Sequence, residues 1–122
     1  MKNKHKFIRN LFIDILVIYI HDSIDVDSIY DEYKECMNDE FNKMKEDVSK
    51  DILGMESDAK VYTHGRSCIL LIGEIKDNKN RYGLIVHELY HIMEYIKSTI
   101  REYNSDNEVY AYMVQQLFMD VI

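Results

Sequence analysis

The sequence predicts an α+β fold in which a small antiparallel or mixed sheet packs on about three helices. A β-branched run lies near the N-terminus, and two apolar arms around a glycine are typical of a hairpin. Long segments with helical periodicity make up most of the rest. The 122 residues contain no proline, only four glycines and no internal repeat, which favours a single domain over residues 1–122.

The first expected strand is Ile15–Ile20, an apolar, largely β-branched run bounded by polar residues. The basic segment before it gives the N-terminus a superficial likeness to a signal peptide. However, Asp14 interrupts the apolar run, no small-residue cleavage site follows, and the run is too short to span a bilayer. We therefore expect a cytoplasmic protein without a membrane partner, in the host cytoplasm if the chain is phage-encoded.

A long amphipathic helix is expected next, after helix-start residues at positions 22–27. Its apolar residues recur at spacings of four, four, three and four, which places them on one helical face: Tyr33, Met37, Phe41, Met44 and Val48. The acidic residues at the start of this segment lack the glycine and the carboxylate spacing of an EF-hand, so we do not expect calcium there.

Residues 60–75 predict a hairpin with arms at Val61–Thr63 and Cys68–Ile72 and a tight turn at His64-Gly65. A polar loop is expected at 76–81, followed by a helix from Gly83 to about Thr99 that breaks near 98–100.

Residues 105–107 mark the start of a last helix. Its apolar positions are Val109, Met113, Leu117 and Val121. Together these segments complete the expected order of strand, helix, two strands, helix and helix.

Charge and cysteine content exclude several classes of function. The net charge of −7 argues against a nucleic-acid partner, because phosphate contacts need a basic surface. Cys36 and Cys68 form no CxxC pair, so we expect two buried free thiols in a reducing compartment.

The segment 83–96, GLIVHELYHIMEYI, contains an HExxH motif. On a helix, His87 and His91 lie one turn apart on the same face and can direct both imidazoles at one Zn²⁺ ion. Glu88 is rotated by about 100° from His87, which keeps it off the metal but close enough to act as general base. By composition, chance alone would produce such a motif in roughly one sequence in sixty.

The residues flanking and within the motif, apart from its two histidines and its glutamate, are uncharged, which predicts that this helix is buried. Buried imidazole and carboxylate groups are costly without partners. A bound metal would satisfy these groups, and so would a hydrogen-bonded polar core.

A catalytic zinc site needs a third protein ligand, and Glu108, 17 residues after His91, is the candidate. Glu108 can approach the histidines if the helix that contains them turns back tightly into the last helix. The same glutamate completes a Ser105-x-x-Glu108 capping box, so its spacing supports a ligand and a helix cap equally.

HELYH followed by NEVYAY resembles the gluzincin clan of zinc peptidases, and resembles more closely small phage and bacterial zincin-like proteins. The resemblance covers Gly83–Tyr112, about a quarter of the chain. It implies a minimal zincin-like domain with one Zn²⁺ per chain, held by His87, His91 and Glu108, with Glu88 as the general base.

The resemblance also implies metal-assisted hydrolysis of a peptide or protein substrate. Tyr112 takes the position of an aspartate that orients a zinc ligand in some of these enzymes. Tyr110, Tyr112 and His64 are candidates for stabilising the oxyanion, and the substrate is expected along the Cys68–Ile72 arm. The alternative is a non-catalytic protein on the same scaffold, for example a phage protein that covers a host factor, with zinc structural or absent.

Overall fold

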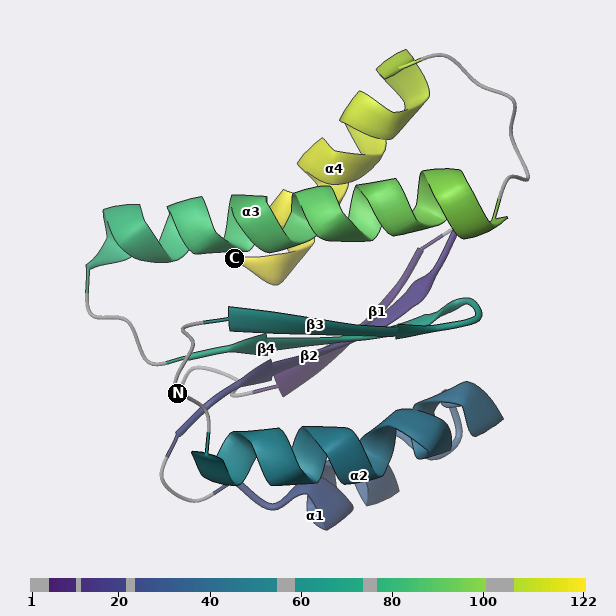
Figure 1. Cartoon of the computed structure of the whole chain (residues 1–122), viewed down its shortest axis with the longest axis vertical. Coiled ribbons are helices and arrows are strands. Elements are labelled where there is room, and N and C mark those ends of the chain that lie inside the picture. The colour runs from purple at the N-terminus through teal and green to yellow at the C-terminus, as the bar shows by residue number, and fades with distance from the viewer. Residues whose placement is uncertain (1–4, 11, 22–23, 55–58, 74–76, 101–106) are drawn as a thin grey trace.

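A central sheet lies between two layers of helices (Figure 1). The computed structural model describes residues 5–10, 12–21, 24–54, 59–73, 77–100 and 107–122. The predicted α+β class is confirmed, with four α-helices in this part of the chain. In chain order the elements are β1 (His5–Arg9), β2 (Asp14–Tyr19), α1 (Val26–Glu32), α2 (Asp39–Gly54), β3 (Ala59–His64), β4 (Ser67–Ile72), α3 (Asn78–Tyr95) with a π-helical continuation over Ile96–Ile100, and α4 (Asn107–Val121).

The sheet is mixed and has the strand order β1-β2-β4-β3. The β2 and β4 strands pair in parallel, whereas β1 pairs antiparallel with β2 and β3 antiparallel with β4. All six residues of β4 are buried, so the second arm of the predicted hairpin is a central strand. Within the described sheet, β1 and β3 are the edges.

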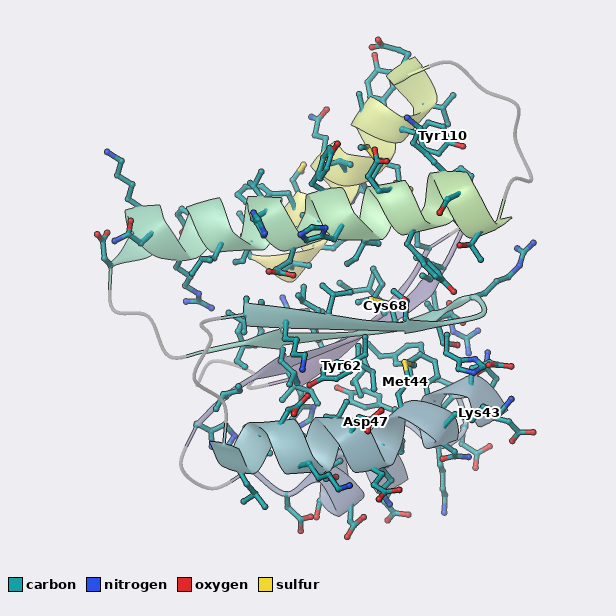
Figure 2. The ribbon with its side chains drawn as sticks, in the orientation of Figure 1. Lys43, Met44, Asp47, Tyr62, Cys68 and Tyr110 are labelled. Carbon is teal, nitrogen blue, oxygen red and sulfur yellow. The ribbon has the colours of Figure 1, made fainter. Side chains whose placement is uncertain are left out.

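Alternate residues of the central strands contribute to two separate cores. On β2, Ile15 and Val17 join the core under α3 and α4, while Leu16 and Ile18 join the core under α1 and α2. On β4, Cys68 and Leu70 join the first core and Ile69 and Leu71 the second. Figure 2 shows Cys68 on the α3 side of the sheet and Met44 of α2 on the other side. Covering both faces explains why these strands are continuous apolar runs.

The predicted hairpin is confirmed, but its turn lies one residue later than expected. His64 pairs with Ser67, which leaves Gly65 and Arg66 as the two turn residues. Gly65 has a φ of 57°, a left-handed conformation that glycine adopts without the steric cost of a Cβ atom.

The prediction of a single long helix after residues 22–27, with Tyr33 to Val48 on one face, is wrong, because α1 ends at Glu32 and α2 begins at Asp39. The backbone N–H groups of Cys36 and Met37 both bond to the Tyr33 carbonyl, which forms a turn. The Asn38 side chain then accepts a hydrogen bond from the Glu40 N–H at 2.9 Å, as an N-cap residue does. The hydrogen bond accepted by the Asn38 side chain therefore caps a second helix, α2, after the turn.

Two further boundaries differ from the predictions. The loop expected at 76–81 is largely helical, because the Asp77 side chain caps α3 by accepting from the Lys79 N–H at 3.0 Å. The β1 strand was not predicted.

Among the described residues, no helix has the length and apolar character needed to cross a membrane.

Candidate metal centre and the adjoining cleft

Helix α3 places its two motif histidines on the face opposite the core. The buried stripe recurs at spacings of four, three and four and consists of Ile85, Leu89, Ile92 and Ile96. At 100° per residue, His87 and His91 lie about 170° and 130° from the middle of that stripe. Both histidines are exposed, so the predicted burial of the whole helix is wrong. Their apolar neighbours Val86 and Tyr90 are 50% and 55% exposed as well.

The two imidazoles converge as the motif predicts. The Nε2 atoms of His87 and His91 are 3.1 Å apart, and the ring centroids are 4.7 Å apart in an edge-to-face arrangement. Two nitrogens bound to one tetrahedral zinc at 2.0–2.1 Å would be about 3.3 Å apart. The histidine pair therefore fits a zinc ion with little rearrangement. Without metal, one neutral ring can donate to the other.

Glu88 is the buried member of the motif. Only 8% of this residue is exposed, and no described residue gives its carboxylate a hydrogen bond or an ion pair. Burial raises the pKa of the Cys68 thiol on β4, and the charge of nearby Glu88 raises it further. A largely buried glutamate that lines a cleft and has no bond to any described residue is a candidate for a functional role.

Glu88 opens onto a cavity of ≈ 350 Å³ between α3 and β3, which we name the β3–α3 cleft. One wall is formed by three residues of α3, namely Glu88, His91 and Tyr95, and the other by four residues of β3, namely Ala59, Lys60, Val61 and Thr63. The cleft thus brings together the predicted base, one predicted zinc ligand and the edge of the sheet.

The alternation of β3 explains the composition of the cleft wall. Val61 belongs to the core on the α3 side, and Ala59 and Thr63, two residues away on either side, point to the same face of the sheet. Tyr62 belongs to the opposite core, and Lys60 and Tyr62 both donate hydrogen bonds to Asp51 of α2. The wall facing Glu88 is therefore mostly small and uncharged.

The strand implied for substrate binding is wrong. Cys68–Ile72 lies in β4, whose backbone pairs with β2 on one side and with β3 on the other. A strand paired on both sides has no free main-chain groups for a peptide. The exposed edge beside Glu88 belongs to β3 instead.

Glu108 is not brought together with the two histidines in a metal-binding group. Helix α4 packs through Tyr110, Met113, Leu117 and Val121, and Glu108 lies about 160° around the helix from Tyr110, where it is exposed. In the described parts of the chain, no cluster of three or more His, Cys, Asp or Glu side chains could hold a metal ion. The role of Glu108 as a ligand stays a prediction, and Ser105 of the alternative cap lies outside the described residues.

None of the three tyrosine and histidine candidates for stabilising the oxyanion lines the β3–α3 cleft. Tyr110 is buried, and its ring centroid lies 6.2 Å from that of Phe12. Tyr112 is 64% exposed and lines a separate cavity beside Phe12. His64 forms an ion pair with Glu40 on the other face of the sheet.

Tyr95 lines the cleft and was not predicted as a site residue. It follows His91 by four residues and Glu88 by seven, and these spacings place all three on one flank of α3. The same spacing would have identified Tyr95 from the sequence.

Comparisons of the chain with protein-family models, with curated proteins and with solved structures find no match. A functional assignment therefore depends on the geometry of the cleft and of the histidine pair.

Proposed function

We propose that this protein is a zinc-dependent peptide hydrolase in which His87, His91 and Glu108 hold the metal and Glu88 is the general base. One observation carries the proposal: Glu88, which is only 8% exposed and has no hydrogen bond or ion pair to any described residue, adjoins two convergent imidazoles and opens onto a cleft beside β3, an edge strand of the described sheet. Imidazole nitrogens and a carboxylate are also a donor set that catalytic zinc uses.

Bound zinc would supply Lewis-acid polarisation of a carbonyl and would activate water near neutral pH. Glu88 would accept a proton from water in the cleft and return it to the leaving amine. The edge of β3 would hold an extended peptide by main-chain hydrogen bonds, a common mode of peptide recognition. The small side chains of Ala59 and Thr63 leave room for a peptide between β3 and α3.

Metal analysis of the purified protein tests this proposal directly. We expect about one zinc ion per chain, lost in His87→Ala and in His91→Ala. Because His64 ends β3 and pairs with Glu40 on the face of the sheet away from α3, His64→Ala is a matched control that should keep the metal. Absence of zinc, even after zinc is added to the protein, would rule out the metal centre.

Metal analysis also distinguishes the two predicted roles of Glu108, zinc ligand and helix cap. As a ligand, Glu108→Ala should weaken zinc binding while the fold is kept. As a helix cap, it should instead cost about 1 kcal/mol of unfolding free energy and leave zinc binding unchanged.

A second candidate function is a non-catalytic interaction protein, and one surface favours it. Tyr82, Val86 and Tyr90 follow one another at four-residue spacing on α3 and are 42%, 50% and 55% exposed. Such a row can bind a partner. A biological effect that persists in Glu88→Gln but is lost in Val86→Asp would favour this function over hydrolysis.

A further inference from the structure

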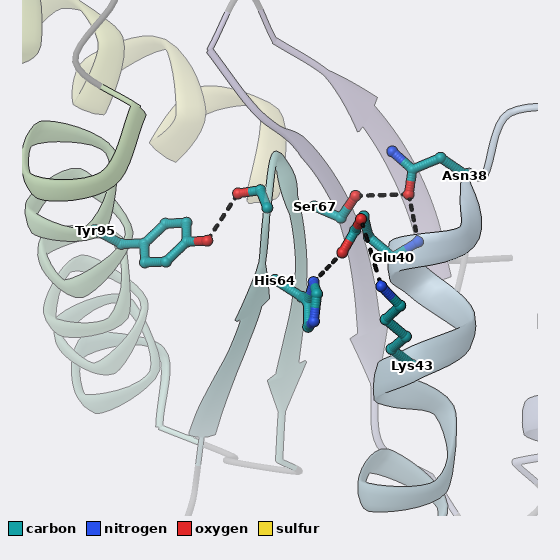
Figure 3. Close-up of polar contacts among 7 residues, drawn as sticks. Asn38, Glu40, Lys43, His64, Ser67 and Tyr95 are labelled. Atoms are coloured by element: carbon teal, nitrogen blue, oxygen red, sulfur yellow. Dashed lines mark hydrogen bonds and ion pairs between the residues drawn. The ribbon is translucent and has the colours of Figure 1, made fainter.

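The β3–β4 turn is held from both faces of the sheet (Figure 3). From the α3 side, the Tyr95 hydroxyl donates to the Gly65 carbonyl at 2.7 Å. From the α2 side, the Glu40 carboxylate pairs with His64 Nδ1, and the Ser67 hydroxyl donates to Asn38 Oδ1 at 3.0 Å. The residues on either side of the turn are therefore bonded to Asn38 and Glu40 at the start of α2, and Gly65 in the turn is bonded to Tyr95 of α3.

The Tyr95 bond joins the α3 wall of the β3–α3 cleft to the turn that follows β3. Tyr95 forms part of the cleft wall together with Glu88 and His91, while its hydroxyl reaches the turn in which β3 ends. Burial, aided by nearby Cys68 and Glu40, raises the pKa of Tyr95, so the hydroxyl stays protonated and can donate.

A tyrosine hydroxyl has a single proton to donate. In Tyr95 this proton is directed at the Gly65 carbonyl, so the same hydroxyl cannot also donate to a charge developing on a substrate. The geometry is that of a link between a helix and a turn, which is a positioning role.

We propose that Tyr95 is a positioning residue that fixes the width of the β3–α3 cleft and thereby the distance from Glu88 to a peptide paired with β3. The residues that line the cleft leave open space between α3 and β3. Since β3 is an edge strand, β4 alone restrains it within the sheet. The catalytic consequence rests on the proposed hydrolase function, but the width of the cleft is a property of the chain itself.

The test compares Tyr95→Phe with Glu40→Gln, which weakens the hold on the same turn from the opposite face. Tyr82→Phe, an exposed tyrosine on the same helix, is the control for loss of a hydroxyl. In Tyr95→Phe, nuclear Overhauser effects between the Thr63 methyl group and α3 should weaken, while those between Tyr62 and α2 stay constant. Glu40→Gln should leave the Thr63 effects unchanged.

Hydrolysis of carboxymethylated casein by the zinc-loaded protein provides the second measurement. Tyr95→Phe should lower kcat about tenfold or more with little change in KM or zinc content, because small misplacements at a reacting centre are costly. Glu40→Gln should reduce thermal stability without reducing kcat.

The positioning role would be overturned if the nuclear Overhauser effects between Thr63 and α3 were unchanged in Tyr95→Phe, or if they weakened equally in Glu40→Gln. If the Thr63 effects respond as expected but the wild-type protein hydrolyses nothing, the hydrolase function fails and the role of Tyr95 in setting the cleft width stands.

Discussion

At the scale of single residues, Glu88 combines a structural cost with a chemical opportunity. Packing of α3 on the sheet leaves this residue only 8% exposed, at the wall of the β3–α3 cleft, and the described residues offer its carboxylate no hydrogen bond or ion pair. Desolvation of a charge without compensation lowers stability. Proteins accept such costs at functional sites, where substitutions that raise stability tend to lower activity.

We therefore expect Glu88→Gln to raise the unfolding free energy of the metal-free protein by about 1 kcal/mol, because an amide is cheaper to bury than a carboxylate. The same substitution should retain zinc and abolish hydrolysis. Urea unfolding after treatment with a chelator measures the first effect. Glu94→Gln, on an exposed position of the same helix, should change stability by less than about 0.5 kcal/mol.

A lower stability of Glu88→Gln than of the wild type would show that the carboxylate has a stabilising partner. In that case its burial would no longer support a catalytic role.

The sequence predicted the convergence of His87 and His91 but not their exposure. Four-residue spacing is a local property of any helix, so the two imidazoles had to lie on one face. Their burial depended on which stripe faces the core, and the spacing of Ile85, Leu89 and Ile92 decides that. Apolar neighbours such as Val86 were a misleading guide, because they lie outside this stripe.

At the scale of elements, α3 is fixed by its buried stripe. Leu89 is fully buried, whereas Val86 is 50% exposed. Leu89→Ala should therefore cost about 2–5 kcal/mol of unfolding free energy through lost burial and cavity formation. Val86→Ala, three residues earlier on the same helix, should cost less than about 0.5 kcal/mol. Comparable losses for the two variants in chemical denaturation would contradict the orientation of α3.

Helix α2 and strand β3 are linked by a cluster whose strength depends on pH. Lys60 donates to Asp51 at 2.7 Å, Tyr62 donates to the same carboxylate, and these bonds lower the pKa of Asp51 below its ordinary 3.8. A carboxyl group with a lowered folded-state pKa contributes stability that is fully present above its unfolded value. That contribution is lost as the pH falls through the lowered value.

Asp51→Asn should thus be less stable than the wild type at pH 6, and the difference should shrink as the pH falls below about 4. Urea unfolding at a series of pH values measures this trend. Asp47→Asn, one helical turn earlier, should show no comparable narrowing. A stability difference for Asp51→Asn that grows at acid pH would reverse the sign of the linkage.

Local sequence signals predicted some elements and missed others. The β3–β4 hairpin and α4 were predictable because turn residues and periodicity are local. The break between α1 and α2 was missed because the apolar spacing continues across it, while the Asn38 side chain interrupts the helix. The β1 strand has little signal of its own, and its order comes from pairing with β2.

At the scale of the whole molecule, the layer arrangement was only partly predictable. Continuous apolar runs in β2 and β4 indicated burial, and the structure covers them on both faces. The parallel pairing of β2 with β4 joins strands separated by two helices and β3. No local pattern encodes such a distant partner, and contacts of this kind form late in folding because the intervening loop must close first.

The predicted site also depends partly on local spacing and partly on long-range packing. The HExxH spacing fixes relations within one helix, whereas the approach of Glu108 depends on how α4 packs against α3. The residues that connect these helices, 101–106, lie outside the described part of the chain. The spacing of Tyr95 from Glu88 and His91 is likewise a local property, whereas its bond to the Gly65 carbonyl depends on the packing of α3 against the hairpin.

Among the described residues β3 pairs only with β4, and its other edge has a consequence for the behaviour of the protein in concentrated solution. An edge that can accept a peptide can equally accept the β3 strand of another molecule, which would begin self-association. Lys60, whose ammonium group pairs with Asp51, opposes a parallel in-register pairing, because that pairing would place two copies of this lysine side by side. Lys60 thus lowers the tendency of β3 to self-associate and restricts which strands can pair with this edge.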